Sequence, residues 1–482
     1  MFTVSKKLKR LMGCVFAGTI VLGALNGCAK EEAVQIEPME IEEVDTYSLD
    51  IIGGSDVMPI IGYYTPTTSW YSAEGSAPRD ILTDEYYEMI ADSGVNLILS
   101  NPRGYNDAPT LMGKALDYAA KYNIGIILTD NTLNGEEVRG TENPLTAEKA
   151  LESMSNYMNH PGFAGVMLYD EPATSYFLST SFAESHRLEK YTEIARVLND
   201  EIGVFTYQNL NPLFDMENKE NYDKYLTEYC ETQYPNYIMF DLYPSEKQHA
   251  NKEYAYLYHL ATFREFGQKY DIPFWSFIAC GSQWNVGNYV PEYESYFPDE
   301  GQFDWSANLS LAFGAKGLAY FPMFQPYYYA YGTGQGDYDF QVNGMFGSWG
   351  NKNQWYYYAQ NMNKHVQVID EILMHSMNKG ILATGEIAQD YCKETRDALL
   401  EGNAWRELAD VSGDAVIGCF NYQGKTVLYV VNASYEYAQK INLSFVDTCN
   451  VKVVQDAEAN YIKGDSITLD MPAGDGVLLL FE

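Results

Sequence analysis

Two adjacent carboxylates, Asp170 and Glu171, stand at the end of an apolar run that Pro172 closes. The run Gly162–Tyr169 has the length and apolar character of a buried parallel strand. A third carboxylate, Asp241, ends the apolar run Tyr237–Phe240 in the same way. Carboxyl groups gathered at strand ends can divide acid–base chemistry, because one group can hold a proton while another stays ionised.

Cleavage of a glycosidic bond is a reaction that needs such a pair. One carboxyl group gives its proton to the leaving oxygen, and the other acts as nucleophile or as base for water. We expect Glu171 to be the acid, because crowding by the ionised neighbours Asp170 and Asp241 favours a proton on it. Asp241 is the first choice for the second carboxylate, and Asp170 is the alternative.

The elements that must position these groups follow a regular rhythm of short apolar runs and amphipathic segments. Eight runs are expected to be strands, and stripes of apolar residues at helical spacing lie between them. The runs are Pro59–Tyr64, Val95–Ser100, Ile124–Asp130, Phe163–Glu171, Ile202–Tyr207, Tyr237–Asp241, Pro273–Ile278 and Gly317–Phe321. This α/β pattern predicts a (β/α)8 TIM barrel. A doubly wound sheet is less well supported, because no Gly-rich phosphate-binding turn follows the first run.

The active site of a barrel lies at the carboxyl ends of its strands, so the polar and aromatic residues near these ends are candidates for substrate binding. For three of these candidates a structural role is the alternative. Asp130 could cap a loop, and Trp275 and Trp284 could pack in the core. The predicted substrate-binding residues are Tyr63, Tyr64, Asn101, Asp130, Tyr207, Gln208, Tyr243, Trp275, Gln283, Trp284 and Gln325.

Beyond the barrel, predicted over residues 51–380, the pattern changes to β-rich runs separated by turns. The runs are Ala415–Phe420, Thr426–Val431, Lys440–Phe445, Val451–Val454 and Gly476–Phe481. We expect residues 381–482 to form a small antiparallel β-sandwich domain.

The first 27 residues have the composition of a signal peptide, with basic residues before an apolar stretch. The segment Leu25-Asn26-Gly27-Cys28 resembles the lipobox of bacterial lipoproteins, which implies cleavage before Cys28 and lipidation of its thiol. An ordinary signal peptide is the alternative. Residues 28–50, rich in Glu, are expected to be a flexible acidic tether. The predicted location is the cell surface or the periplasm-facing side of a membrane. The protein is expected to contact that membrane only through the lipid on Cys28.

Composition restricts the partners of the folded part. The formal net charge of the 482 residues is −35, which argues against nucleic acid as a partner. Cysteine and histidine show no metal-ligand spacing, and no cofactor motif is present, so neither a metal nor a cofactor is expected. Aromatic residues make up 15% of the chain, with 42 tyrosines that suit stacking on sugar rings. An oligo- or polysaccharide is therefore the expected partner.

Tyr169-Asp170-Glu171-Pro172 resembles the Asn-Glu-Pro motif on the fourth strand of the large retaining glycoside hydrolase clan. The segment Ala312–Phe321 resembles the last helix and strand of its β-galactosidase-like barrels. The resemblance implies that Glu171 is the acid/base. Asp170 departs from the clan's Asn, and the run Phe274–Gly281 lacks the clan's strand-seven nucleophile. Carboxylates on strands four and six also resemble the α-galactosidase-like clan, and a substrate-assisted mechanism on N-acetyl sugars is a third option.

Two other classes of function remain open. The missing strand-seven carboxylate favours a non-catalytic carbohydrate-binding surface lipoprotein on a degenerate barrel, whereas the paired Asp170 and Glu171 disfavour it. A structural surface protein, whose Tyr-rich loops bind a protein partner, is the other rival.

Overall fold

The computed structural model describes residues 56–66, 81–100, 109–130, 133, 146–172, 174–178, 182–213, 218–233, 235–244, 252–281, 298–324, 344–347, 350–385 and 407–482. The predicted signal and tether lie outside these ranges, and so do five of the predicted functional residues. These are Cys28, Asn101, Gln283, Trp284 and Gln325.

Eight parallel strands form the barrel, in the order β5-β4-β3-β2-β1-β8-β7-β6. A parallel bridge between Leu210 and Phe240, with Leu210 N 3.0 Å from Met239 O, joins β5 to β6 and closes the ring. The predicted barrel is therefore confirmed. The strands are β1 (Ile60–Tyr63), β2 (Leu97–Leu99), β3 (Gly125–Leu128), β4 (Phe163–Asp170), β5 (Thr206–Asn209), β6 (Ile238–Phe240), β7 (Phe274–Ala279) and β8 (Leu318–Phe321).

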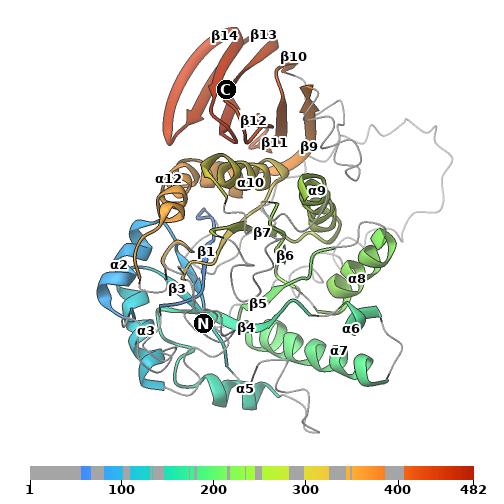
Figure 1. Ribbon diagram of the computed structural model, residues 1–482. Coiled ribbons are helices and arrows are strands. Elements are labelled where there is room, and N and C mark those ends of the chain that lie inside the picture. Colours follow the sequence, from blue (N-terminus) through green and yellow to red (C-terminus); the bar gives the residue numbers. More distant parts are fainter. Residues whose placement is uncertain are drawn as a thin grey trace, which may run out of the picture.

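The helices surround this ring (Figure 1). They are α2 (Asp84–Asp92), α3 (Pro109–Lys121), α5 (Ala147–Met154), α6 (Ser175–Leu178), α7 (Phe182–Ala195), α8 (Lys219–Thr232), α9 (Lys252–Tyr270), α10 (Glu300–Phe313) and α12 (Gln354–Met374). Helix α7 continues as a π-helix, η2 (Arg196–Ile202), which ends at Gly203 with φ of +78°. The expectation that the fifth strand begins at Ile202 is therefore wrong, because that residue completes a helix and the strand begins at Thr206.

Apolar side chains form two separate layers around the barrel wall. An inner barrel core, which includes Met167, Tyr207, Met239 and Trp275, fills the ring. A much larger helix-facing core lies between the strands and the helices. Membership of one layer or the other shows which way a strand residue faces, because side chains alternate along a strand.

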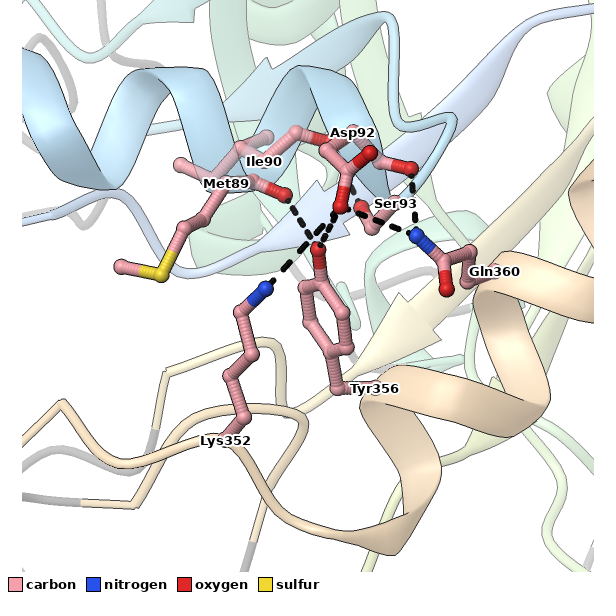
Figure 2. A network of polar contacts seen from close by, with 7 residues as sticks. All are labelled: Met89, Ile90, Asp92, Ser93, Lys352, Tyr356 and Gln360. Carbon is pink, nitrogen blue, oxygen red and sulfur yellow. Dashed lines mark hydrogen bonds and ion pairs between the residues drawn. The ribbon is translucent and has the colours of Figure 1, made fainter.

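The last helix meets the first across the seam of the ring (Figure 2). The Tyr356 hydroxyl of α12 donates to Met89 O at 3.0 Å and to Asp92 Oδ2 at 2.9 Å, both at the end of α2. Gln360 Nε2 donates to Asp92 O and Oδ2, each at 3.0 Å. Lys352 Nζ lies 3.9 Å from the centre of the Tyr356 ring. These contacts fasten the two ends of the helical ring together.

The C-terminal strands form one seven-stranded antiparallel sheet, ordered β10-β13-β15-β12-β11-β9, with β14 paired to β13. The antiparallel class of the predicted domain is confirmed, although a single sheet stands in place of two distinct ones. The strands are β9 (Met377–Thr384), β10 (Leu408–Ser412), β11 (Ala415–Tyr422), β12 (Lys425–Asn432), β13 (Gln439–Gln455), β14 (Glu458–Met471) and β15 (Gly476–Phe481). Strand β9 spans the expected domain boundary and belongs to this sheet.

The sheet packs on α10 and α12 (Figure 1). Trp305 Nε1 of α10 donates to Ala433 O at 2.9 Å, and the Tyr429 hydroxyl donates to Asn308 Oδ1 at 2.7 Å. His365 of α12 is buried in the same interface, with Nε2 3.2 Å from that hydroxyl. The C-terminal sheet therefore braces the side of the barrel formed by its last helices. None of the helices in the described part of the chain combines the length and apolar character needed to cross a bilayer.

Candidate active site

A β-bulge in β4 turns Asp170 into the barrel. Met167 pairs with Tyr207 and Tyr169 pairs with Gln208, so Leu168 is an extra residue in the strand. Both Leu168 and Tyr169 consequently belong to the helix-facing core. In strict alternation from the inward Met167, Asp170 would face the helices. The bulge reverses the alternation, as bulges beside active sites often do.

The carboxylate of Asp170 receives a hydrogen bond on each oxygen. The Tyr63 hydroxyl from β1 donates to Oδ2 at 3.3 Å, and Asn209 Nδ2 from β5 donates to Oδ1 at 3.1 Å. Donors that point at a carboxylate stabilise its charged form. Asp170 is therefore a half-buried carboxyl group whose orientation is fixed by two donors.

Glu171 is the next residue, and its backbone is fixed on both sides. Its N–H donates to Asn209 O at 3.0 Å, and its carbonyl accepts from Asn211 Nδ2 at 2.9 Å. Its φ is +44°, which is uncommon for a residue with a side chain. Residues held in such a conformation cluster at functional sites. The residue is exposed at the strand tip, so it can meet a molecule arriving from solvent.

Asp241 follows β6, and its carboxyl group interacts with the side chains of Glu171 and Asn209. Burial raises the pKa of Asp241 well above its ordinary value, and the charges of Glu171 and Asp170 raise this pKa further. These two neighbouring carboxyl groups form the Glu171–Asp241 pair, in which the raised pKa favours a proton on Asp241. Asp241 Oδ1 is buried and has no hydrogen-bond partner among the described residues.

Aromatic rings from β1, β7, β8 and the turn after β6 gather beside these carboxyl groups. Tyr63 and Tyr64 stack with their ring centres 4.4 Å apart, and Phe321 lies 5.5 Å from Tyr63. Tyr243 stacks on Phe321 at 6.0 Å. Because Tyr63 also donates to Asp170, the aromatic cluster is continuous with the acidic one.

Tyr207 is fully buried on the inner face of β5, and its hydroxyl has no hydrogen-bond partner in the described part of the chain. Burial raises the pKa of this hydroxyl, and the neighbouring Asp170 and Asp241 raise it further. Tyr207 thus stays protonated beside the two aspartates.

Gln208, Asp130 and Trp275, which the sequence predicts to bind substrate, have other contacts in the structure. Gln208 faces the helices, where Tyr169 and Tyr229 donate to its Oε1 at 2.9 and 2.7 Å. Asp130 Oδ2 accepts hydrogen bonds from Ser153 and Tyr157, which connect it to the segment of α5.

Trp275 has no exposure to solvent. It is fully buried in the inner barrel core, where Tyr237 stacks on it at 4.0 Å. Packing in the core, the other interpretation considered for this tryptophan, matches this position.

Asn209 is absent from the predicted set, although it contacts all three acidic residues. Its side chain reaches Asp170 and Asp241, and its carbonyl accepts the N–H of Glu171. The period of two along β5 places it on the same side as Tyr207, and this signal could have identified it. Within the ranges that the structure describes, no three His, Cys, Asp or Glu side chains are grouped so that they could hold a metal ion.

No protein-family model matches this chain, and no curated protein sequence matches it. Solved structures do resemble it in fold. One described as a glycoside hydrolase has a TM-score of 0.48 and 10% identity, over 88% of this chain and 93% of its own. A GH27 β-L-arabinopyranosidase from Geobacillus stearothermophilus has a TM-score of 0.45 and 12% identity, over 88% and 96%. An α-amylase from H. orenii has a TM-score of 0.45 and 12% identity, over 88% and 99%. The chain's own strand order shows a (β/α)8 barrel, and its activity must be argued from its own side chains.

Proposed function

We propose that this protein is a glycoside hydrolase in which Glu171 is the general acid/base and Asp170 is the ionised partner. The observation that carries the proposal is the difference between two neighbouring acidic environments. Asp170 accepts two hydrogen bonds that favour its charge, whereas burial and the neighbouring charges favour a proton on Asp241, beside Glu171. Paired carboxyl groups in opposite protonation states are what glycoside cleavage requires.

Asp241 changes its role in this proposal. The two carboxyl groups that flank a glycosidic bond stand about 5 to 10 Å apart, because the sugar or a water must fit between them. Asp241 is in direct contact with Glu171, so it cannot stand across the sugar from it. We therefore assign Asp241 to the acid side of the site, where it holds the proton beside Glu171. Asp170 is then the second catalytic carboxylate.

The reaction then follows from these positions. The Glu171–Asp241 pair gives its proton to the leaving oxygen as the bond between that oxygen and the anomeric carbon breaks. Asp170 either attacks that carbon or takes a proton from the water that attacks it. In either case water supplies the hydroxyl that ends on the sugar, and its remaining proton restores the pair.

A carbohydrate substrate suits the surroundings of these groups. Three oxygen atoms in this region are buried without a hydrogen-bond partner among the described residues: Asp241 Oδ1, Asn209 Oδ1 and the Tyr207 hydroxyl. Buried polar atoms are nearly always satisfied, so such a set requires an explanation. A ligand with several hydroxyl groups can supply the missing partners, and the aromatic cluster around Phe321 offers rings on which sugars stack.

One observation supports the non-catalytic alternative. The inward residues of β7 are Trp275, Phe277 and Ala279, so a small apolar side chain ends the strand on its inner face. By the family resemblance a carboxylate would be expected at the end of this strand. A protein that binds carbohydrate without cleaving it is therefore the second candidate function.

We also propose that the protein is exported and anchored by an acyl chain on Cys28, which rests on the sequence of residues 1–28 alone. Replacing Cys28 with Ala should release the protein from the membrane fraction. If the variant stays in that fraction, the anchor is not the acyl chain on Cys28.

The central experiment compares the wild type with Glu171→Gln on a panel of glycans and aryl glycosides. We expect hydrolysis to fall by about 10³-fold while binding persists, since the glutamine cannot donate the proton. The loss should be smaller for aryl glycosides with good leaving groups, because these need less protonation.

The matched control is Glu220→Gln, which removes an exposed carboxylate that pairs with Lys224 on α8 and should leave turnover unchanged. Equal turnover by the wild type and Glu171→Gln would refute the assignment of the acid. Sugar binding without any product release would instead support the second candidate function.

A further inference from the structure

We propose that Asn209 is a positioning residue that orients the Asp170 carboxyl group and keeps it ionised beside Asp241. This inference rests on the proposed function for its catalytic meaning, although the protonation pattern can be measured without a substrate. Asn209 has no proton to give in the reaction and is not assigned a place at the reacting atoms. It acts through the carboxyl groups that it contacts.

The strand register places Asn209 between the acidic residues. It pairs with Asp170 across β4 and β5, and it is 1% exposed. Its carbonyl accepts the N–H of Glu171 at 3.0 Å, so the same residue also fixes the backbone of the acid. Its side chain contacts Asp170, at the end of β4, and interacts with Asp241, which follows β6. A single residue of β5 therefore connects the chemistry of β4 with that of β6.

The amide group is suited to this place because Nδ2 carries two hydrogens. Nδ2 donates to Asp170 Oδ1 at 3.1 Å, and the Asn209 side chain also lowers the pKa of Asp241. The residue thus acts on two acidic groups without adding a charge. Its Oδ1 is buried without a hydrogen-bond partner among the described residues, so it can accept from a hydroxyl group of the ligand.

The two aspartates respond differently to the same donor. Asp170 has a second donor in Tyr63, so its charge is stabilised on both oxygens. At Asp241, Asn209 lowers the pKa, but burial and the charges of Glu171 and Asp170 raise it by more. These larger effects favour the protonated form of Asp241. The pair of contacts therefore separates the protonation states of two aspartates that share one neighbour.

Tyr63 provides an internal comparison, because its hydroxyl donates to Asp170 Oδ2. Removing Asn209's amide should affect both aspartates, whereas removing the Tyr63 hydroxyl should affect chiefly Asp170. A general loosening of the barrel mouth would not produce this difference. The comparison therefore separates a positioning role from a merely structural one.

The first experiment follows the carboxyl carbons of Asp170 and Asp241 by NMR in full-length protein labelled with ¹³C-aspartate. Asp170→Asn and Asp241→Asn assign the signals. In Asn209→Ser we expect both titrations to move to higher pH, Asp170 by about one unit, because a donor to a carboxylate is lost. In Tyr63→Phe we expect only the Asp170 titration to move.

Asn211→Ser is the matched control, since the Asn211 amide donates to the backbone carbonyls of Glu171 and Pro172. It should leave both titrations in place. Unchanged titrations in Asn209→Ser, or equal shifts in Asn211→Ser, would overturn the proposal. If Asn209→Ser does not fold, the isosteric Asn209→Asp replaces it and should raise the Asp170 titration further by adding a like charge.

The second experiment measures kcat/KM against pH on a glycan that the wild type hydrolyses. The acidic limb reports Asp170, which must be ionised, and the basic limb reports the pair, which must be protonated. Asn209→Ser should move both limbs to higher pH, and Tyr63→Phe only the acidic limb. Shifted NMR titrations without any hydrolysis would refute the proposed function and keep the Asn209 assignment. Hydrolysis with unshifted titrations would refute the Asn209 assignment alone.

Discussion

Asp241 and Glu171 meet side chain to side chain at the barrel mouth, where the residue after β6 reaches the tip of β4. Burial raises the pKa of Asp241 most, and the charges of Glu171 and Asp170 raise it further. A carboxyl group whose pKa is higher in the folded state binds its proton more tightly there than in the unfolded chain. Its contribution to stability is fully present below the unfolded pKa of about 3.9 and is lost as pH rises through the folded pKa.

Asp241→Asn should therefore make the protein more stable at pH 8 and less active. The asparagine keeps the shape of the side chain but cannot ionise, so the cost of burying a charge disappears. We expect the Tm to rise by about 2 °C or more at pH 8, and to change little at pH 4, where the aspartic acid is protonated. Thermal unfolding at both pH values tests this.

Asp465→Asn, at an exposed position of β14, is the control for removing one charge. An equal gain in that variant would mean that net charge, not the burial of Asp241, explains the effect. A lower Tm for Asp241→Asn at pH 8 would contradict the assignment of a proton to Asp241.

Trp275 should matter for stability and not for substrate affinity. It is fully buried, its ring stacks on Tyr237 at 4.0 Å, and the ring would collide with any Cβ at Gly317. Trp275→Phe should cost about 1 to 3 kcal/mol of unfolding free energy, because a smaller ring leaves a cavity. KM should stay within about twofold, because the ring packs against Tyr237 and Phe205 in the inner barrel core.

Phe321→Ala is the comparison, because Phe321 is only partly buried in the aromatic cluster beside Asp170. In that variant KM should rise several-fold. An increase in KM for Trp275→Phe, with unfolding unchanged, would restore the stacking role expected from the sequence.

The eight strands could be predicted because buried parallel strands are continuous apolar runs. The direction of individual side chains could not be predicted in the same way. The fifth run was expected to start at Ile202, but Arg196–Ile202 prolongs α7, and the strand begins at Thr206. Gln208 therefore lies within the strand and faces the helices, while Asn209 faces inward. Because β5 begins at Thr206 and not at Ile202, Asn209 takes the inward position in place of the predicted Gln208.

Asp170 shows a second limit of sequence reasoning. Its inward direction depends on the bulge at Leu168, and the apolar residues Met167, Leu168 and Tyr169 contain no sign of it. Similarly, β14 was missed because its residues are largely exposed and polar. Strand β13 contains two predicted runs joined by exposed residues. Pairing with a partner strand, which no local pattern records, determines both cases.

His259 should make the barrel sensitive to acid. Its Nε2 accepts the N–H of Leu213 at 2.7 Å, and its Nδ1 lies 2.6 Å from Ala255 O, so the ring is neutral. Burial lowers the pKa of His259 to about 4. A histidine with a lowered pKa contributes stability above its unfolded value of about 6.5, and this contribution is lost as pH falls towards the folded value. The maximum loss is about 3 kcal/mol.

The measurement is the unfolding free energy of the wild type and His259→Gln between pH 7 and pH 4.5. The difference between the two should narrow as pH falls, since only the histidine has to be protonated. His365, whose pKa burial also lowers to about 4, should show the same narrowing in His365→Gln. A difference that stays constant with pH in both variants would show that neither ring is held neutral.

The seam between α2 and α12 should depend on one hydroxyl more than on one charge (Figure 2). The Tyr356 hydroxyl joins Met89 O and Asp92 Oδ2, at 3.0 and 2.9 Å. The ion pair between Lys352 and Asp92 is 4.0 Å long, and the Asp92 side chain is 61% exposed. Surface pairs of this kind contribute about 0 to 1 kcal/mol, whereas a hydrogen bond to a charged group contributes about 1.5 to 3 kcal/mol.

Tyr356→Phe should therefore lower the unfolding free energy by about 2 kcal/mol, because Asp92 and the Met89 carbonyl both lose a donor. Lys352→Met should cost less, even though the ammonium also lies over the Tyr356 ring. Tyr357→Phe is the matched control, because that neighbouring ring is 53% exposed and its change should be close to neutral. Denaturant unfolding of the three variants decides the order. A larger loss for Lys352→Met than for Tyr356→Phe would mean that charge, not the shared hydroxyl, closes the ring of helices.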